Sequence, residues 1–453
     1  MTTIQIVTTL IFVGAYVFIA SEKIHKTTVA LAGATLMLLL GGFGVDILTQ
    51  QEALHGVHGV AGRVEIEGVD WNTILLLVGM MIIVAITRET GIFEWIAIRS
   101  AKIAKGRPMA ILMIMSLITA VLSALLDNVT TVLLIAPVII VICRQLELDP
   151  VPFLICAILA SNIGGTATLI GDPPNIMIAS VAQFSFLDFI KINGPVCCVA
   201  FLAYAGVVKL VFGKRLQVSD ELRQRIMSFD ESQTIQDKPL LIKCGAVIGL
   251  TMTGFLAHGS MHLEPATIAL SGAALLLILY GRKPTKILEE VEWPTIFFFI
   301  GLFIMVSGLV KVGVVKMLAS GALDLTGGET PTMTMLILWL SAIASGIVDN
   351  IPFVATMNSL VVDIAHSEVT GGATGLAGLH HEKIIPLWWA LSLGACFGGN
   401  MTLVGASANV VVAGIASGAG HPISFIRFMK YGVPITLLTV AIAAVYVWLI
   451  FLR

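Results

Sequence analysis

Charged residues are scarce in this chain. Asp, Glu, Lys and Arg together make up 12% of the 453 residues, whereas hydrophobic residues make up 57%. A typical soluble domain has about 25% charged residues. Apolar runs long enough to cross a membrane recur from one end of the sequence to the other. The composition therefore excludes an ordinary soluble protein and predicts an all-α polytopic membrane protein.

Signals of several other protein classes are also missing. The six cysteines form no CxxC pair and no Cys/His spacing typical of a metal site. The apolar runs contain no HExxH motif and no nucleophile elbow, so we expect neither an enzyme nor a cofactor. The net charge of −2 gives no reason to expect a nucleic-acid partner. The expected partners are membrane lipid and small solutes.

The first apolar run, 4–20, has no basic region before it and no small-residue cleavage site after it. We therefore expect a retained helix rather than a signal peptide. The longest polar segment, 214–238, is too short for a soluble core and is predicted to lie in a cytoplasmic linker, 213–240. Further membrane spans are predicted at 27–45, 71–90, 240–257, 265–280, 293–310 and 433–451.

Two apolar stretches, 151–180 and 384–414, are interrupted in the middle by paired glycines and by polar residues. A broken helix survives in a membrane only where it is buried in protein or lines a cavity. Broken helices in corresponding positions of two halves indicate the binding site of a secondary transporter. The polar residues predicted to bind substrate or protons here are Asn162, Thr166, Thr168, Asp172, Asn175, Asn400, Thr402, Ser407 and Asn409.

An acidic dipeptide interrupts another apolar run in each half, at Asp127-Asn128 and at Asp349-Asn350. The run over 108–143 is long enough to enter the membrane, turn and return, so each dipeptide is predicted to form the tip of a hairpin. An acid at mid-membrane depth costs about 2.5–3.5 kcal/mol and usually faces a cavity. A helix N-cap is the structural alternative, and both roles can coexist. Thr130 and Thr131 add neutral hydrogen-bonding groups beside Asp127.

The two halves of the chain repeat. Asp127-Asn128 matches Asp349-Asn350 at the same offset that relates Gly79 to Gly301. We predict two repeats, 71–212 and 292–453, each with a re-entrant hairpin and a broken helix, and scaffold helices in 1–70 and 241–291.

Orientation follows from the positive-inside rule. Placing the basic clusters in the cytoplasm makes the second repeat inverted relative to the first, and both termini are then predicted to be extracytoplasmic.

No Arg or Lys occurs in the four polar segments of the predicted site. A carboxylate or phosphate substrate normally requires a cationic partner. Acids without a base suit a proton, a metal cation or a neutral hydrogen-bonding solute. If protons and solute compete for the same carboxylates, antiport follows without further machinery.

Four motifs carry a resemblance to a known family: LLDNVTTVLLIAP, SNIGGTATLIGDPPN, SGIVDNIPFVATM and GGNMTLVGASANVVVAGIA. Together they resemble the ArsB/NhaD group of the ion transporter superfamily. The last motif is most similar to the branch that contains the pink-eyed dilution (P) protein, whose microbial members are often called ArsB-like.

The resemblance implies an elevator-type transporter. It also implies proton-coupled efflux of arsenite or antimonite, as the neutral trihydroxide, across the cytoplasmic (inner) membrane. Sodium/proton antiport of the NhaD kind and anion transport are the alternatives. Dicarboxylate transporters of the superfamily have Ser-Asn-Thr at the hairpin tips, and the acids found here depart from that pattern. A homodimer and an arsenite-stimulated ATPase subunit are partners known among relatives.

Overall fold

The computed structural model describes residues 1–453 except 22, 44, 46, 61–62, 214–215, 217, 228–230, 232–233 and 262. Eight helices in the described part are long and apolar enough to cross a membrane, and several shorter apolar helices accompany them. The prediction of a helical polytopic membrane protein is confirmed. Lys214 and Arg215, in the predicted linker, lie outside the described residues.

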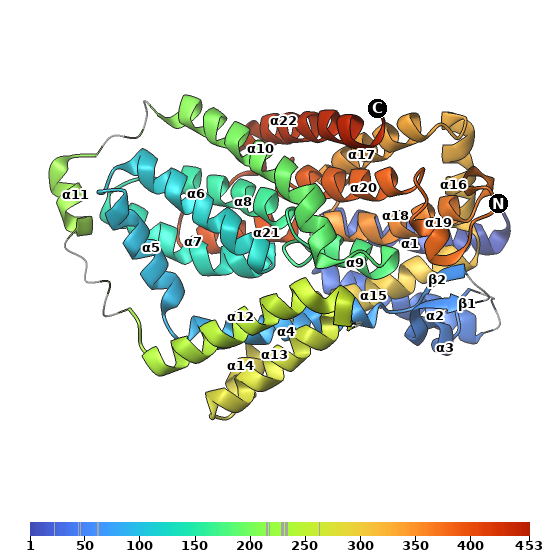
Figure 1. Cartoon of the computed structure of the whole chain (residues 1–453), viewed down its shortest axis with the longest axis horizontal. Helices are drawn as coiled ribbons and strands as arrows, with labels where there is room; N and C mark the ends of the chain where they lie inside the picture. The colour runs from blue at the N-terminus through green and yellow to red at the C-terminus, as the bar shows by residue number, and fades with distance from the viewer. Residues whose placement is uncertain are drawn as a thin grey trace.

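The N-terminal part contains α1 (Thr3–Ser21), α2 (Lys26–Gly42) and α3 (Gln50–His55), followed by β1 (Gly56–Val60) and β2 (Arg63–Glu67). The two strands pair antiparallel, with Val57 opposite Ile66. This two-stranded sheet is an addition to the predicted helical architecture. It lies with α3, α16 and α19 at one end of the molecule, and α5 and α11 lie at the other end (Figure 1).

The first predicted repeat contains α4 (Trp71–Arg88), α5 (Ile92–Ile103), α6 (Pro108–Leu125), α7 (Asn128–Gln145), α8 (Val151–Gly165), α9 (Pro173–Ala182) and α10 (Phe186–Phe212). The middle of the chain contains α11 (Asp220–Met227), α12 (Lys238–Met261), α13 (Pro265–Tyr280) and α14 (Thr285–Glu289).

The second predicted repeat contains α15 (Trp293–Lys311), α16 (Val314–Thr326), α17 (Thr330–Ile347), α18 (Asn350–Ala365), η2 (Glu368–Thr370), α19 (Gly375–Leu379), α20 (Ile385–Gly398), α21 (Ser407–Gly418) and α22 (Phe425–Phe451). The last helix begins earlier than the predicted span at 433.

The helices of the two halves interlock. Within each half, α6 packs on α8 and α17 packs on α20. Between the halves, α7 contacts α21, α18 contacts α9, and α10 contacts α22. The interruptions of the broken helices, 166–172 and 399–406, therefore lie between elements of both halves.

Close helix packing occurs at matching positions in the two halves. A Cβ added to Gly79 would lie 2.8 Å from the Ala269 carbonyl carbon, and one added to Gly301 would lie 2.7 Å from that of Ala30. The two alanines lie in the similar segments VALAGA (29–34) and IALSGA (268–273). The correspondence thus includes α2 and α13, which the sequence analysis placed outside the repeats.

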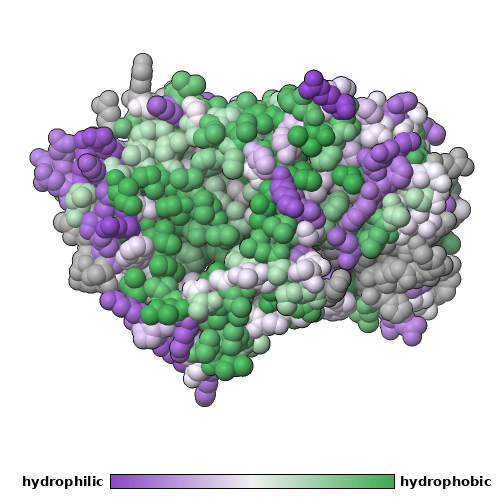
Figure 2. Space-filling view, viewed as in Figure 1, coloured by the Kyte–Doolittle hydropathy of each residue, from purple (hydrophilic) through white to green (hydrophobic). Residues whose placement is uncertain are grey.

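Surface hydropathy agrees with a membrane location. Hydrophobic side chains dominate the middle of the face seen in Figure 2, over α6, α10, α12 and α13. Hydrophilic side chains gather at the end that carries α5 and α11. An apolar band between polar ends is expected for a protein whose middle contacts hydrocarbon.

Candidate functional site

Each hairpin-tip helix begins directly after a buried aspartate. Asp127 caps α7 and accepts hydrogen bonds from the Thr130 backbone N–H, at 2.8 Å, and from the Thr130 hydroxyl. Asp349 caps α18 and accepts from the Ile351 N–H at 3.2 Å. Both side chains therefore act as N-caps. Their other carboxylate contacts differ between the halves, as described below.

Two asparagines hold the breaks in the helices. Asn175 Nδ2 donates to the carbonyl oxygens of Thr166 and Thr168, at 3.1 and 2.9 Å. Asn409 Nδ2 likewise donates to the carbonyl oxygens of Gly399 and Thr402 at the second break, at 2.7 and 2.9 Å. Carbonyl groups left without helical partners are costly in an apolar environment. These two predicted binding residues thus have a structural role.

Two threonines fasten each break to its neighbouring hairpin. Thr168 donates from its hydroxyl to the Ala124 carbonyl, and Thr402 donates to the Gly346 carbonyl, each at 2.6 Å. Ala124 and Gly346 are at matching positions, close before the two acidic dipeptides. The breaks and the hairpin tips are therefore coupled in the same way in both halves.

An amide cluster joins the two halves at the centre. Asn162 Nδ2 donates to Asn400 Oδ1 at 2.9 Å and to Asn409 Oδ1 at 3.0 Å. Its own Oδ1 accepts from Asn128 Nδ2 at 3.2 Å. These four asparagines are almost completely buried. The cluster connects α7 and α8 with both sides of the second break.

Asp172 bridges the two hairpin tips. Its carboxylate accepts from Asn128 Nδ2 at 3.2 Å and from Asn350 Nδ2 at 3.3 Å. The side chain is fully buried, and the matching residue in the second half is Ala406. Asp172 is therefore an acid shared by both tips.

Lys26 is a site residue that sequence reasoning missed. Its Nζ lies 2.9 Å from Asp349 Oδ2 and also contacts the Ser407 hydroxyl. Ser407 donates to the same carboxylate oxygen at 2.8 Å. The four polar segments contain no base, but the inference that the site has none is wrong. Packing of α2 on α15 brings Lys26 to the tip, and no sequence signal indicates this.

A cavity of about 470 Å³ opens onto this ion pair. Lys26, Glu292, Asp349, Ser407 and Val410 are among its lining residues. Burial, with a smaller contribution from the charge of nearby Asp127, raises the pKa of Glu292, which precedes α15, to about 7. We call this the first cavity.

Glu292, in the lining of the first cavity, lies close in the chain to an ion pair with the end of α4. Arg88, at the end of α4 just before α5, lies 4.0 Å from Glu290, two residues before Glu292. The basic residues of α5 and of the segment around α14 are on this same side.

A second cavity of about 390 Å³ lies between α4, α9 and the α12–α13 connection. Its lining includes Ile176 and Pro265, which match Val410 and Lys26 of the first cavity. None of the aspartates at the tips or the breaks lines it.

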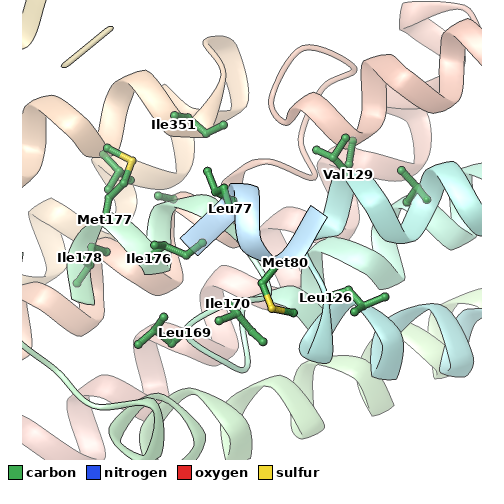
Figure 3. Close-up of a cluster of buried hydrophobic side chains, with 14 of the residues drawn as sticks. Leu77, Met80, Leu126, Val129, Leu169, Ile170, Ile176, Met177, Ile178 and Ile351 are labelled. Carbon is green, nitrogen blue, oxygen red and sulfur yellow. The ribbon is translucent and has the colours of Figure 1, made fainter. Parts of the chain in front are cut away.

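Apolar residues of α4, α9 and the first break close off this side. Figure 3 shows Leu77 and Met80 of α4 among Leu126, Ile170 and Ile176. All five side chains are buried. Asp349 therefore borders the first cavity, whereas neither acidic dipeptide lines the second.

Two polar atoms beside Asp127 could accept a hydrogen bond from a ligand. Among the described residues, Asn128 Oδ1 and the Thr131 hydroxyl are buried without a hydrogen-bond partner. No three His, Cys, Asp or Glu side chains of the described part are grouped as a metal site would require. Among the described residues at the tips, three aspartates and Glu292 are found with one ammonium group, that of Lys26.

Two further polar residues belong to the same network. Asn193 of α10 donates to the Thr166 carbonyl at 3.0 Å and to Ser392 at 2.8 Å. Ser392 donates to Asn175 Oδ1 at 2.7 Å. Asn193 interrupts an apolar span, and this was a signal that sequence reasoning did not use. Asn193 and Ser392 thus join the predicted site residues in one hydrogen-bond network.

The chain belongs to the citrate transporter family (CitMHS), whose family profile matches residues 16–394. It is 46% identical to an "uncharacterized transporter" of Mycobacterium tuberculosis over 98% of both chains. It is 31% identical to the P protein of Homo sapiens, with 97% of this chain and 59% of that protein covered. Membership of a transporter family makes this chain a membrane transporter. The narrower ArsB/NhaD assignment stays a prediction.

Among solved structures, the fold is similar to that of the YdaH transporter of Alcanivorax borkumensis. The TM-score is 0.57, the sequence identity is 14%, and the match covers 94% of this chain and 98% of that one. At this identity the likeness concerns the fold alone.

Proposed function

We propose that this protein is a proton-coupled secondary transporter that exports a small neutral solute, with arsenite or antimonite trihydroxide as the leading cargo. The observation that carries the proposal is the surplus of carboxylates over ammonium groups at the hairpin tips. A surplus of buried acids repels anions and provides sites for protons. The function rests on Asp127, Asp172 and Asp349.

The hydrogen-bonding groups suit a solute rich in O–H donors. Asn128 Oδ1 and the Thr131 hydroxyl oxygen are buried acceptors without partners among the described residues. Carboxylates at both tips add stronger acceptors. A neutral trihydroxide donates three hydrogen bonds without bringing a charge. Protonation of the same carboxylates removes these acceptors, so proton entry and solute exit are coupled.

Two inverted repeats and an elevator movement would give the site access to both sides. The matching breaks differ in cover: Val404 of the second break lines the first cavity, whereas the first break, which borders the second cavity through Leu169, is buried and lies beside α4. Movement of the tips and breaks against α2, α4, α13 and α15 would exchange these environments. The basic residues on the side of Glu292, a lining residue of the first cavity, support a cytoplasmic location for this cavity, and therefore extracytoplasmic termini.

A carboxylate anion such as citrate is the second candidate cargo. The ammonium of Lys26 beside the Ser407 hydroxyl supports it, because such a pair can bind a carboxylate. The family's description as citrate transporters points the same way. The surrounding acids require that such an anion enter with protons or with a cation. Sodium/proton antiport, with the same aspartates as cation ligands, is the third.

Transport into proteoliposomes decides between these cargoes. The purified protein is reconstituted, and uptake of radiolabelled arsenite, citrate and sodium is measured with and without a pH gradient. We expect arsenite uptake that depends on the gradient and no uptake of the other two. Citrate uptake, or sodium uptake coupled to proton release, without arsenite uptake would overturn the choice of cargo. Light scattering of the purified protein, with and without a candidate ATPase, tests the proposed dimer and ATPase partner.

A further inference from the structure

We propose that Lys26 is a tethered counter-cation, which neutralises Asp349 when no cargo is bound and is displaced from it when cargo enters the first cavity. The inference rests on the proposed function in one respect, namely that Asp349 binds cargo. The ion pair itself and its place between two groups of helices are independent of that function.

The geometry places Lys26 and Asp349 on different parts of the bundle. Lys26 is the first residue of α2, which packs on α1 and α15. Asp349 precedes α18, and Ser407 is the first residue of α21. The ion pair therefore connects the helices around α2 with the hairpin tip and the second break. If these parts move against each other, the pair must break.

The atoms that bind Lys26 are also the atoms that face the cavity. Lys26 Nζ contacts Asp349 Oδ2 and the Ser407 hydroxyl, and Ser407 donates to the same oxygen. All three residues line the first cavity. A solute that hydrogen-bonds to this carboxylate oxygen from the cavity meets the ammonium already there. Binding of cargo and binding of Lys26 are therefore mutually exclusive at this oxygen.

The displaced ammonium has other favourable contacts within reach. Lys26 Nζ lies 4.8 Å from the centroid of the Phe298 ring, at a distance typical of a cation–π contact. Glu292 lies in the same cavity wall and interacts electrostatically with Lys26. The lysine side chain is a flexible chain of four methylene groups, so its ammonium can leave Asp349 without movement of α2. The ammonium then stays in the wall of the cavity.

The device belongs to one half only. The residue that matches Lys26 in the α13 register is Pro265, which lines the second cavity and cannot supply a charge. A buried carboxylate that loses its partner is strongly destabilised. Neutralisation by Lys26 would therefore favour the state in which the tips face the first cavity, so that the carrier without cargo returns to that state.

The first test does not depend on the cargo. Spin labels are placed on exposed positions of α2 and α21 by Leu31→Cys and Ser417→Cys in a Cys198→Ser background, and the distance distribution is measured by pulsed EPR. We expect K26Q and D349N each to shift or broaden the distribution, and K26R to keep it. The matched control is K23Q, which removes a charge from an exposed position three residues away. Identical distributions for K26Q, D349N and K23Q would overturn the proposal.

The second test separates net transport from exchange, with labelled arsenite as the probe. In exchange the carrier moves only when loaded, so Lys26 is not required. We expect K26Q to slow net uptake about tenfold or more, and to leave arsenite–arsenite exchange within about twofold of the parent. Equal losses in both modes would overturn the counter-cation role. If the parent protein moves no arsenite, the proposed cargo fails, and the distance test still decides the role of Lys26.

Discussion

The two breaks of this transporter are held by similar hydrogen bonds, yet one is covered and the other is open. Ile176, after the first break, is 3% exposed, whereas its counterpart Val410 is 39% exposed. Their own sequences do not explain this, because both residues are β-branched and apolar. The difference lies in the neighbours: α4 covers Ile176, and the first cavity lies beside Val410. Equivalent segments thus have opposite environments within one chain.

The largest effect is expected when the acids at the two hairpin tips are replaced, one in each half of the chain. We expect D349N and D127N each to abolish proton-coupled arsenite uptake, a loss of about 100-fold or more. Each variant removes a carboxylate that is proposed to bind protons during transport. The measurement is uptake into proteoliposomes under a pH gradient. The control is D324N, at an exposed position of α16. Normal coupling in both tip variants would refute the role of the acids.

Cysteine labelling tests the difference in cover directly. In the Cys198→Ser background, V410C should react with a water-soluble maleimide at least ~30-fold faster than I176C, since reaction at the buried position requires local opening. Labelling rates are followed by mass spectrometry in proteoliposomes. Equal rates would mean that the two breaks share the same average environment. A condition that reverses the ratio would identify the opposite state of the carrier.

The close glycine contacts test the similarity of the halves. G79A and G301A each place a methyl group within 3 Å of a backbone carbonyl carbon, and we expect each to lower the free energy of unfolding by about 1–3 kcal/mol. The measurement is unfolding in detergent. The control is G194A, where an added Cβ has no neighbour within 4 Å. A lower free energy of unfolding in only one of the two variants would show that the halves do not pack equivalently.

The smallest effects are expected at the ends of α4 and α15, where matching residues carry opposite charges. Lys311 bonds to Glu52 at 2.6 Å, and Glu89 bonds to Lys286 at 2.9 Å. Partial burial acts to raise the pKa of Glu52, but hydrogen bonds from Lys311 and Thr49 outweigh it and lower that pKa to about 2. The resulting stabilisation is complete above the ordinary glutamate pKa and is lost as the pH falls toward 2.

We therefore expect E52Q and E89Q each to lower the free energy of unfolding by less than about 1 kcal/mol near pH 7, as for other partly exposed ion pairs. The difference in free energy of unfolding between each variant and the parent should become smaller below about pH 4.5, where the glutamate of the unfolded chain becomes protonated. Unfolding at a series of pH values measures it. A gap that widens on acidification would contradict the assignment.

Much of the architecture could be predicted from composition and periodicity. The spans predicted at 71–90, 265–280 and 293–310 correspond closely to α4, α13 and α15. The polar residues at the breaks were identifiable because asparagines and glycines stand out within apolar runs. The small sheet was not predicted, because a short polar loop has no strong signal of its own.

The roles of the predicted site residues could not be separated in advance. Asn175 and Asn409 hold backbone carbonyls, whereas Asn128 and Asn350 converge on Asp172. Amide side chains suit either role, and only their partners distinguish them. The carboxylate contacts differ as well: Asp349 faces Lys26, whereas Asp127 bonds to Thr130.

The sequence by itself determined that this chain is a helical membrane protein with polar residues concentrated at two tips and two breaks. Hydropathy and the cost of unpaired backbone groups in hydrocarbon act on each segment separately, so these features are readable from the chain alone. Only the tertiary structure decided that Lys26 pairs with Asp349 and that Ile176 is buried whereas Val410 is exposed. Those features depend on helix packing between distant segments, and no local pattern encodes it.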